Sequence, residues 1–226
     1  MEEPRADLLE FVEAEKFGAI LADPPWRFMN RTGKVAPEHR RLARYGTMSF
    51  EEIVELPVKE LALPQSHLYL WVPNALVEEG LKVMKHWGFR YKTNLVWFKV
   101  RKDGGPDGRG VGFYFRNVTE LVLFGTRGSM RTLPPGRRQV NLLTERKREH
   151  SRKPEQIYDI IERCSPGPYL EMFARHGHNN WYQWSDELCR KPEGTENDLE
   201  ELTARSAGAM AETPSVRQEV LLGLTE

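Results

Sequence analysis

The chain has 226 residues, of which 39% are hydrophobic and 29% charged, with a net charge of zero; this length and composition suit one soluble domain with a tail. It holds no run of about 18 apolar residues, and its acidic start is unlike a signal peptide, so we expect neither a membrane span nor secretion. Two isolated cysteines, Cys164 and Cys189, argue against a disulfide framework and favour a reducing, cytoplasmic compartment.

The charge is unevenly distributed along the chain. Residues 1–16 and 191–226 are acidic, whereas residues 17–190 are basic. We therefore expect an acidic N-terminal segment over 1–16, a folded domain over 17–190 and an acidic tail over 191–226 that is helical or disordered. Arginine and lysine concentrate over 127–153, which we predict to be a long loop. Such a loop either grips phosphates or is a solvated charged surface.

The first predicted strand, Phe17–Leu21, runs directly into the turn Asp23-Pro24-Pro25-Trp26. Open α/β sheets bind ligands at the carboxyl ends of their strands, where this turn lies. Proline has no backbone N–H, so the turn offers a carboxylate and carbonyl acceptors beside an indole ring. This edge suits an amino group on a flat ring, although a plain surface turn is the alternative.

Strands and helices alternate along the rest of the chain. Residues 4–15 form a short amphipathic helix at best, and Ser49 with Glu52 forms a capping box that opens a helix. Further strands are predicted at 67–72, 94–99, 120–124, 169–173 and 180–184, with helices at 76–87 and 154–164 and loops at 27–44 and 101–118. This order predicts an α/β fold, with a mostly parallel twisted sheet and helices on both faces.

A zinc site is the one metal interpretation that the sequence invites. His176 and His178 are two residues apart, but the cysteines are not paired with each other. Cys164 lies on the apolar face of the predicted helix and is interpreted as a core thiol. We therefore expect no metal ligands.

Eight short motifs occur in a fixed order along the chain. They are Asp23-Pro24-Pro25-Trp26, Tyr45-Gly46-Thr47-Met48, Leu70-Trp71-Val72, Trp97-Phe98-Lys99, Arg116-Asn117 with Glu120, Ser151-Arg152-Lys153-Pro154-Glu155, Leu170-Glu171-Met172-Phe173-Ala174-Arg175 and Asn180-Trp181. This series resembles the MT-A70 branch of the S-adenosylmethionine-dependent N6-adenine methyltransferases, from about Phe17 to Leu188. The resemblance implies a Rossmann-like class I methyltransferase fold with a permuted motif order, in which the catalytic strand comes first and the main cofactor strand last.

The resemblance assigns the catalytic role to the turn after the first strand. Asp23 and the carbonyl of Pro24 would accept the two hydrogens of the adenine amino group, favouring the pyramidal nitrogen that attacks a methyl. Trp26 would stack near the base or close the pocket, and Pro25 completes the turn. Orienting the two reactants in a dry pocket would supply much of the rate acceleration.

The resemblance places the S-adenosylmethionine site mainly near the end of the domain. Lys153 would contact the methionine carboxylate or the base, and Asp23 would face both ligands. Asp186 stands where the family has an amide, and an aspartate can still accept from the adenine amino group or a ribose hydroxyl. The full set of expected cofactor residues is Asp23, Lys153, Phe173, Arg175, His178, Asn179, Asp186 and Glu187.

The substrate residues come from both sources, resemblance and charge. Glu120 begins an apolar strand, so it either fixes a loop through an arginine such as Arg116 or lines the base pocket. Trp97 is either core or a base contact, and Tyr45 could stack on a flipped base. The full set of expected substrate residues is Tyr45, Trp97, Arg116, Asn117, Glu120, Arg146, Lys147, Arg148 and Lys153.

The sequence thus predicts an N6-adenine methyltransferase that acts on nucleic acid, with DNA favoured over RNA. An RNA N6-adenosine methyltransferase and a catalytically silent, nucleic-acid-binding subunit of the same fold are the alternatives. Members of such families often pair, so a homodimer is also to be considered. Methylation of a free nucleoside or a protein amide is disfavoured by the basic loops.

Overall fold

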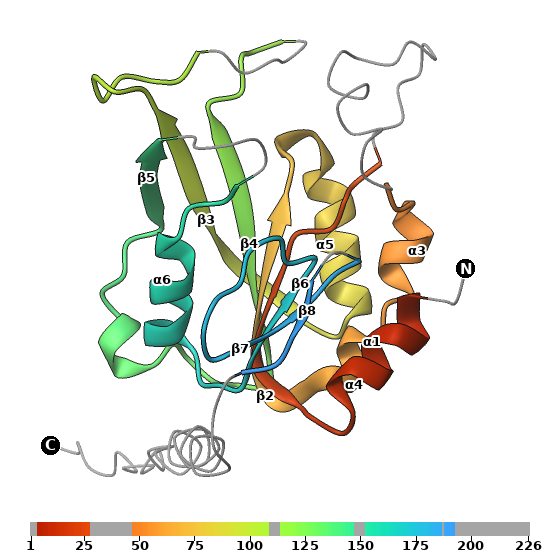
Figure 1. Cartoon of the computed structure of the whole chain (residues 1–226). Helices are drawn as coiled ribbons and strands as arrows, with labels where there is room; N and C mark the ends of the chain where they lie inside the picture. The colour runs from red at the N-terminus through yellow and green to blue at the C-terminus, as the bar shows by residue number, and fades with distance from the viewer. Residues whose placement is uncertain (1–3, 28–46, 109–113, 147–151, 187, 193–226) are drawn as a thin grey trace, which may run out of the picture.

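The computed structural model describes residues 4–27, 47–108, 114–146, 152–186 and 188–192 (Figure 1). Its helices are α1 (Pro4–Val12), α3 (Phe50–Val54), α4 (Val58–Leu61), α5 (Val77–His86) and α6 (Gln156–Cys164), with short 3-10 turns η1 (Asn74–Leu76) and η2 (Pro134–Gly136). Its strands are β1 (Phe17–Ala22), β2 (Ala62–Val72), β3 (Arg90–Val100), β4 (Thr119–Arg127), β5 (Leu142–Arg146), β6 (Tyr169–Met172), β7 (Trp181–Trp184) and β8 (Cys189–Arg190). In this part of the chain, none of the helices is long and apolar enough to cross a bilayer.

The described strands form one sheet in the order β5-β3-β4-β2-β1-β6-β7-β8. β1 lies near the middle and runs parallel to both neighbours, β2 and β6. Among the described strands, β6–β7 and β3–β5 are also parallel pairs, whereas β4 runs antiparallel to β2 and β3, and β8 antiparallel to β7. The expected Rossmann-like α/β fold is confirmed. β4 is reversed relative to β2 and β3, and the described residues of the connection between β3 and β4 form no helix.

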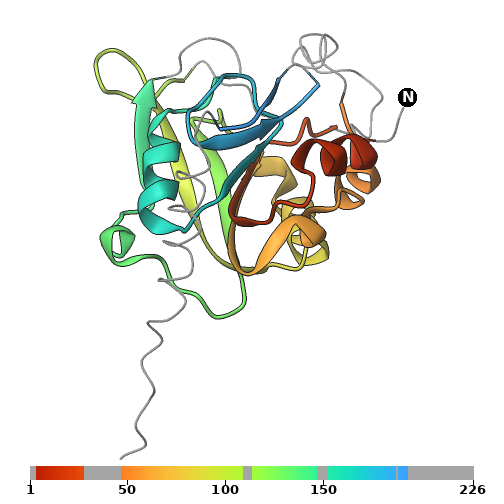
Figure 2. The same ribbon diagram turned by 60° about the horizontal axis from the view of Figure 1, so that its bottom comes forward.

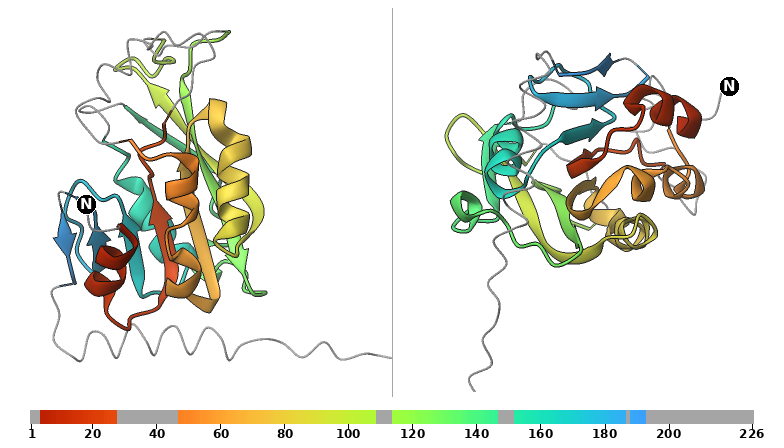
Figure 3. Two further views of the ribbon diagram at one scale, coloured as in Figure 1. Left: turned by 90° about the vertical axis from the view of Figure 1, so that its right-hand side faces the viewer. Right: turned by 90° about the horizontal axis from the view of Figure 1, so that it is seen from below.

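Helices lie on both sides of the sheet (Figures 2 and 3), and a layer of buried apolar side chains fills the space on each face. Ile20 and Ala22 of β1 join the layer under α1, α3, α4 and α5, while Ala19 and Leu21 join the layer under α6. All six residues of β1 are buried, as expected for a strand with helices over both faces. β1 is therefore a rigid base for the turn that follows it.

Local sequence signals account for several of the helix boundaries. The predicted capping box is present: the Glu52 N–H donates to Ser49 Oγ at 3.2 Å, and the Ser49 N–H donates to Glu52 Oε2 at 2.6 Å. α5 is followed by Gly88 in a left-handed conformation, with φ of +84°. α6 begins two residues later than predicted, because Pro154 and Glu155 form a preceding turn in which Pro154 O accepts from the Ile157 N–H.

The prediction of one long loop over 127–153 is wrong for its described part. Arg127 ends β4, and its guanidinium donates to the backbone oxygens of Lys59 and Ala62 at 2.6 and 2.9 Å. Residues 142–146 form the edge strand β5, whose Leu143 is fully buried against the α6 layer. Pairing with β3 and one buried leucine are enough to make this charged stretch a strand. A pattern of apolar residues cannot reveal a strand that is so short and has one buried side chain.

The N-terminal segment packs onto the domain through α1. Leu8 and Val12 are buried in the same layer as β1, and the Trp184 indole N–H donates to Asp7 Oδ2 at 2.9 Å. Acidic composition alone did not indicate this contact. Cys164 is buried on α6, as the sequence predicts for a core thiol. Residues 193–226, most of the predicted acidic tail, lie outside the described residues.

Candidate active site

Asp23 follows the last residue of β1, at the carboxyl end of two adjacent parallel strands. Its backbone N–H donates to Met172 O at the end of β6, over 3.3 Å. Because β1 and β6 are parallel, their carboxyl ends meet at one edge of the sheet and the side chains that follow them converge there. The carboxylate of Asp23 is thus held at the position where this class of sheet binds ligands.

The two prolines and Trp26 fix the turn by backbone and side-chain bonds. Pro24 O accepts from the Trp26 N–H at 2.8 Å, and Pro25 O accepts from the Met48 N–H at 3.0 Å. The indole N–H of Trp26 donates to Trp71 O at 2.9 Å, and Trp26 is only 6% exposed. Trp26 was expected to stack near the base or to close the pocket; in the structure its ring packs in the core. A carbonyl oxygen has two lone pairs, so Pro24 O keeps one acceptor position.

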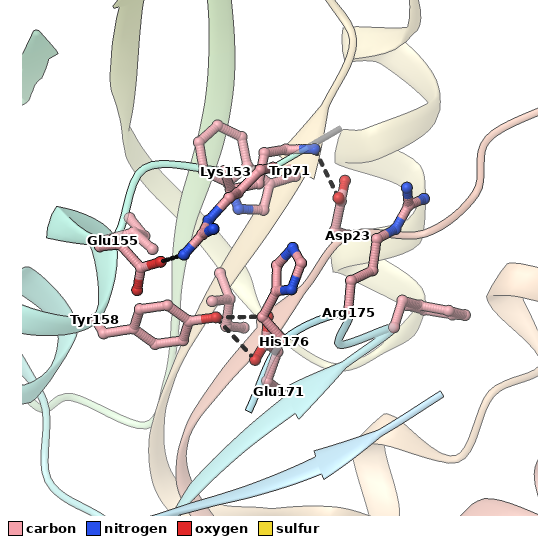
Figure 4. Close-up of a pocket in the computed structure, with 12 residues that line it drawn as sticks. Asp23, Trp71, Lys153, Glu155, Tyr158, Glu171, Arg175 and His176 are labelled. Carbon is pink, nitrogen blue, oxygen red and sulfur yellow. Dashed lines mark hydrogen bonds and ion pairs between the residues drawn. The ribbon is translucent and has the colours of Figure 1, made fainter. Parts of the chain in front are cut away.

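A pocket opens beside Asp23 between β1, β2, β6 and the start of α6 (Figure 4). Carboxylates and cations alternate around it, with aromatic rings between them. Its lining residues are Leu21, Asp23, Trp71, Arg152, Lys153, Glu155, Ile157, Tyr158, Glu171, Phe173, Arg175 and His176. Of the twelve, the sequence had singled out Asp23, Lys153, Phe173 and Arg175 as cofactor residues.

Lys153 connects the catalytic turn to the other side of the pocket. Its Nζ donates to Asp23 Oδ2 at 2.6 Å, lies 3.7 Å from Glu120 Oε2 and sits 5.1 Å above the centre of the Trp71 ring. Burial disfavours the ammonium, but the carboxylates of Asp23 and Glu120 outweigh that effect and raise the pKa of Lys153. Lys153 therefore stays cationic beside Asp23.

Glu120 is the second residue of β4 and is paired with lysines. Lys99 Nζ donates to Glu120 Oε1, and Lys99 lies on β3, which pairs with β4. The Lys99 ammonium also lies 4.8 Å from the centre of the Trp97 ring. Trp97 is 3% exposed and its indole N–H donates to Glu145 O at 3.1 Å, so of the two interpretations of Trp97 the structure favours core packing.

Glu171 is a pocket residue that sequence reasoning did not select. Both of its carboxylate oxygens accept from the Tyr158 hydroxyl at 3.0 Å, and Oε2 also accepts from Gln183 Nε2 at 2.6 Å. Burial raises the pKa of Glu171 to about 7, more than these hydrogen bonds lower it. An acid inside the otherwise apolar β6 was the available signal, because such a side chain needs partners.

Phe173 and Arg175 reach the pocket through a tight turn after β6. The backbone of Phe173 has φ of +68°, which is uncommon for a residue with a side chain. Its N–H donates to Trp184 O at 2.6 Å, and its ring packs against the Trp184 ring with centres 5.5 Å apart. The strand β7 thereby holds this turn, which carries Arg175 along the same edge as Asp23 (Figure 4).

Three expected cofactor residues are not among those that line the pocket. His178 stacks on Tyr158 with ring centres 4.0 Å apart, and its Nε2 lies 3.4 Å from Glu162 Oε1. Asn179 Oδ1 accepts from Arg190 at 3.1 Å, and Asp186 is exposed. His178 supports the pocket through Tyr158. Asn179 lies beside it in the connection between β6 and β7, whereas Asp186 lies after β7.

Lys153 is the one expected substrate residue of the described part that lines the pocket, and the others fall on the β3–β4–β5 side of the sheet or outside the described residues. Asn117 Oδ1 lies 3.4 Å from Asn74 Nδ2, Arg116 precedes β4 and Arg146 ends β5. Arg116 and Arg146 are not among the residues that line the pocket. Tyr45, Lys147, Arg148 and Glu187 lie outside the described residues.

Comparison with known proteins gives consistent results. The MT-A70 family model matches residues 17–187. The N(6)-adenosine-methyltransferase MT-A70-like protein of Drosophila melanogaster is 32% identical over 185 residues, 80% of this chain and 28% of its own. The N(6)-adenosine-methyltransferase catalytic subunit METTL3 of Homo sapiens is 29% identical over 178 residues, covering 76% and 28% of the two chains. The Type II methyltransferase M.MunI of a Mycoplasma species is 27% identical over 202 residues, covering 82% and 83%. The chain thus spans about a quarter of the length of the N6-adenosine methyltransferases that it matches.

Proposed function

The chain belongs to the MT-A70 family, and from that membership we propose that it transfers a methyl group from S-adenosylmethionine to the N6 amino group of adenine in nucleic acid. The observation that carries the proposal is the acceptor-rich turn after β1. It places the Asp23 carboxylate against Lys153, at a pocket lined by further charged groups. The proposal covers the activity and substrate of this chain and does not extend to the parts of its longer relatives that it does not match.

The charges around the pocket fit the methyl donor. S-adenosylmethionine carries a carboxylate, an ammonium and a sulfonium, and the pocket presents cations and carboxylates in close succession. We assign the donor's carboxylate to Lys153 or Arg175 and its cationic groups to Asp23 or Glu171. When bound, the donor supplies a methyl group on sulfur and leaves as a neutral thioether.

The chain's own residues orient the adenine amino group. Within the described part of the chain, Lys153 is the only hydrogen-bond donor to the Asp23 side chain, so this carboxylate keeps acceptor positions for an N–H. Pro24 O offers a second acceptor on the same turn. The two acceptors hold the amino hydrogens while its lone pair faces the methyl, and the proton leaves once nitrogen has become cationic.

For the polymer, we propose DNA. The supporting observation is that the Type II methyltransferase matches most of both chains, whereas the N6-adenosine methyltransferases match over about a quarter of their own length. The cations of the β3–β5 side, including Arg146, would supply the contacts to phosphates. A homodimer remains a proposal that depends on measurement of the oligomeric state.

One experiment tests the activity and the polymer together. The purified protein is incubated with methyl-labelled S-adenosylmethionine and matched single- and double-stranded DNA and RNA, followed by nucleoside mass spectrometry. We expect N6-methyladenine in DNA. Label in RNA alone would refute the choice of polymer, and S-adenosylmethionine binding without any labelled adenine would refute the activity in favour of a silent binding subunit.

The role of Asp23 has its own variant. Asp23→Asn keeps the size and one acceptor oxygen but removes the charge beside Lys153, so we expect methyl transfer to fall by about 10²–10⁴-fold. Asp159→Asn removes the same charge from an exposed position on α6 and is the matched control. Equal rates for the Asp23 variant and its control would contradict the assignment.

A further inference from the structure

Four charged side chains form a continuous row of alternating sign that crosses from β3 to the catalytic turn. Lys99 donates to Glu120, Glu120 Oε2 lies 3.7 Å from Lys153 Nζ, and Lys153 Nζ is 2.6 Å from Asp23 Oδ2. The exposed fractions of the side chains are 14% for Lys99, 31% for Glu120 and 22% for both Lys153 and Asp23. Lys99, at the far end of the row, is thus the most buried of the four.

The two ammonium groups lie over two tryptophan rings that pack against each other. Lys153 Nζ lies over the Trp71 ring and Lys99 Nζ over the Trp97 ring, at 5.1 and 4.8 Å from the ring centres. The two indoles pack edge to face, with centres 6.1 Å apart, and both are buried. Cations held over aromatic faces keep their charge at low solvent exposure, so the row is fixed by packing as well as by ion pairs.

Lys153 therefore lies near two carboxylates, one that it contacts directly and one that is farther away. Asp23 holds it now, and Glu120 is 3.7 Å away with its other oxygen engaged by Lys99. With Lys99 present, the two lysines balance the two carboxylates. Without Lys99, Glu120 loses one cation and its attraction for the Lys153 ammonium increases.

We propose that Lys99 is a positioning residue: by holding Glu120, it leaves Lys153 on Asp23 and keeps the row electrically neutral while the adenine amino group binds. This proposal rests on the proposed function. As the amino group takes acceptor positions on Asp23, Glu120 offers the Lys153 ammonium a second partner within a short movement. Lys99 itself acts through Glu120 and reaches neither adenine nor the methyl donor.

The charged and titratable groups around this row set the expected pH dependence. The pKa of Lys153 is raised overall, because Asp23 and Glu120 outweigh burial and the nearby Arg175. The pKa of Glu171 is raised by burial and, to a lesser extent, by the Asp23 charge. Removing Lys99 takes one positive charge away from this set. Glu120, which loses the Lys99 ammonium, should then take up a proton at higher pH, and Lys153 loses the charge of its second carboxylate.

The test compares Lys99→Met, Lys99→Arg and the wild type in steady-state methyl transfer from pH 5 to 9. For Lys99→Met we expect kcat to fall about tenfold, KM for the donor and the nucleic acid to change less than about threefold, and the acid limb of the kcat profile to move up by about one pH unit. Lys99→Arg keeps the positive charge, so its kcat and its pH profile should match those of the wild type. Lys82→Met, which removes an exposed lysine of α5 paired with Glu78, is the charge-matched control and should behave as the wild type.

Three results would overturn the proposal. They are a wild-type kcat profile in Lys99→Met, an equal defect in Lys99→Arg, or the same shift in Lys82→Met. A second readout needs no catalysis: the carboxyl ¹³C resonance of Glu120 is followed by NMR, and its titration should move to higher pH in Lys99→Met. If the wild type transfers no methyl, the proposed function fails, and an unmoved Glu120 titration separately refutes the coupling to Lys99.

Discussion

Glu171→Gln tests, without any activity assay, whether burial of this carboxyl group makes the stability of the protein depend on pH. In the folded protein burial raises the pKa of Glu171 from 4.5 to about 7, so folding favours the protonated form. The stability that this group contributes is complete below pH 4.5 and is lost as the pH rises through 7. With 1.36 kcal/mol per pKa unit, the loss is about 3 kcal/mol in the free energy of unfolding. Glutamine does not titrate, so the variant should lack this loss.

The assay is urea denaturation of both proteins at several pH values between 4.5 and 8.5, with linear extrapolation to water. The stability of Glu171→Gln relative to the wild type should rise with pH, with most of the change complete by pH 8. Glu78→Gln removes an exposed carboxylate on α5 and is the control, which should keep the wild-type pH dependence in this range. A constant difference between Glu171→Gln and the wild type would refute the burial of a protonated carboxyl group here.

Three further substitutions test features of the fold. Trp26→Phe removes the indole N–H that donates to Trp71 O, and the loss of this buried hydrogen bond should lower the free energy of unfolding by about 0.5–1.5 kcal/mol; an unchanged urea midpoint would contradict this. Gly18→Ala brings a methyl within 2.6 Å of two backbone oxygens, so thermal denaturation should show a loss of about 1–3 kcal/mol, and wild-type stability would show that β1 shifts freely. Burial lowers the pKa of His67 to about 4, so the wild type loses stability as the pH falls from 6.5 toward 4. His67→Gln should lose less stability over this range when acid unfolding is followed by circular dichroism. An identical acid transition in the two proteins would argue against a buried neutral imidazole.

Much of the fold could be predicted from local sequence patterns. The apolar run before Asp23 and the capping box at Ser49 each record their structure within a few residues, and both are present. The direction of β4 could not be predicted, because alternation of apolar side chains is the same for parallel and antiparallel strands. The edge strand β5 was missed for a related reason, since Leu143 is its single buried residue.

The site was predictable where a short motif marks it and unpredictable where distant segments meet. Asp23 stood out by its neighbours in sequence, but its partner Lys153 lies 130 positions away, and only the family resemblance drew attention to it. The ion pair of Lys99 with Glu120 depends on the register of β3 against β4, which no local signal gives. Glu171 was visible as an acid in an apolar strand, yet its bonds to Tyr158 and Gln183 depend on the packing of α6 and β7.

Trp71 contacts the catalytic turn through its backbone and the pocket lysine through its side chain. Its backbone oxygen receives the Trp26 indole on the face of the sheet covered by α1, α3, α4 and α5, while its own ring supports Lys153 on the α6 face. The bond to the carbonyl does not depend on which side chain position 71 carries. Pocket redesign can therefore begin at this position, by varying the surface beneath the lysine while the geometry of the catalytic turn is inherited unchanged from the backbone.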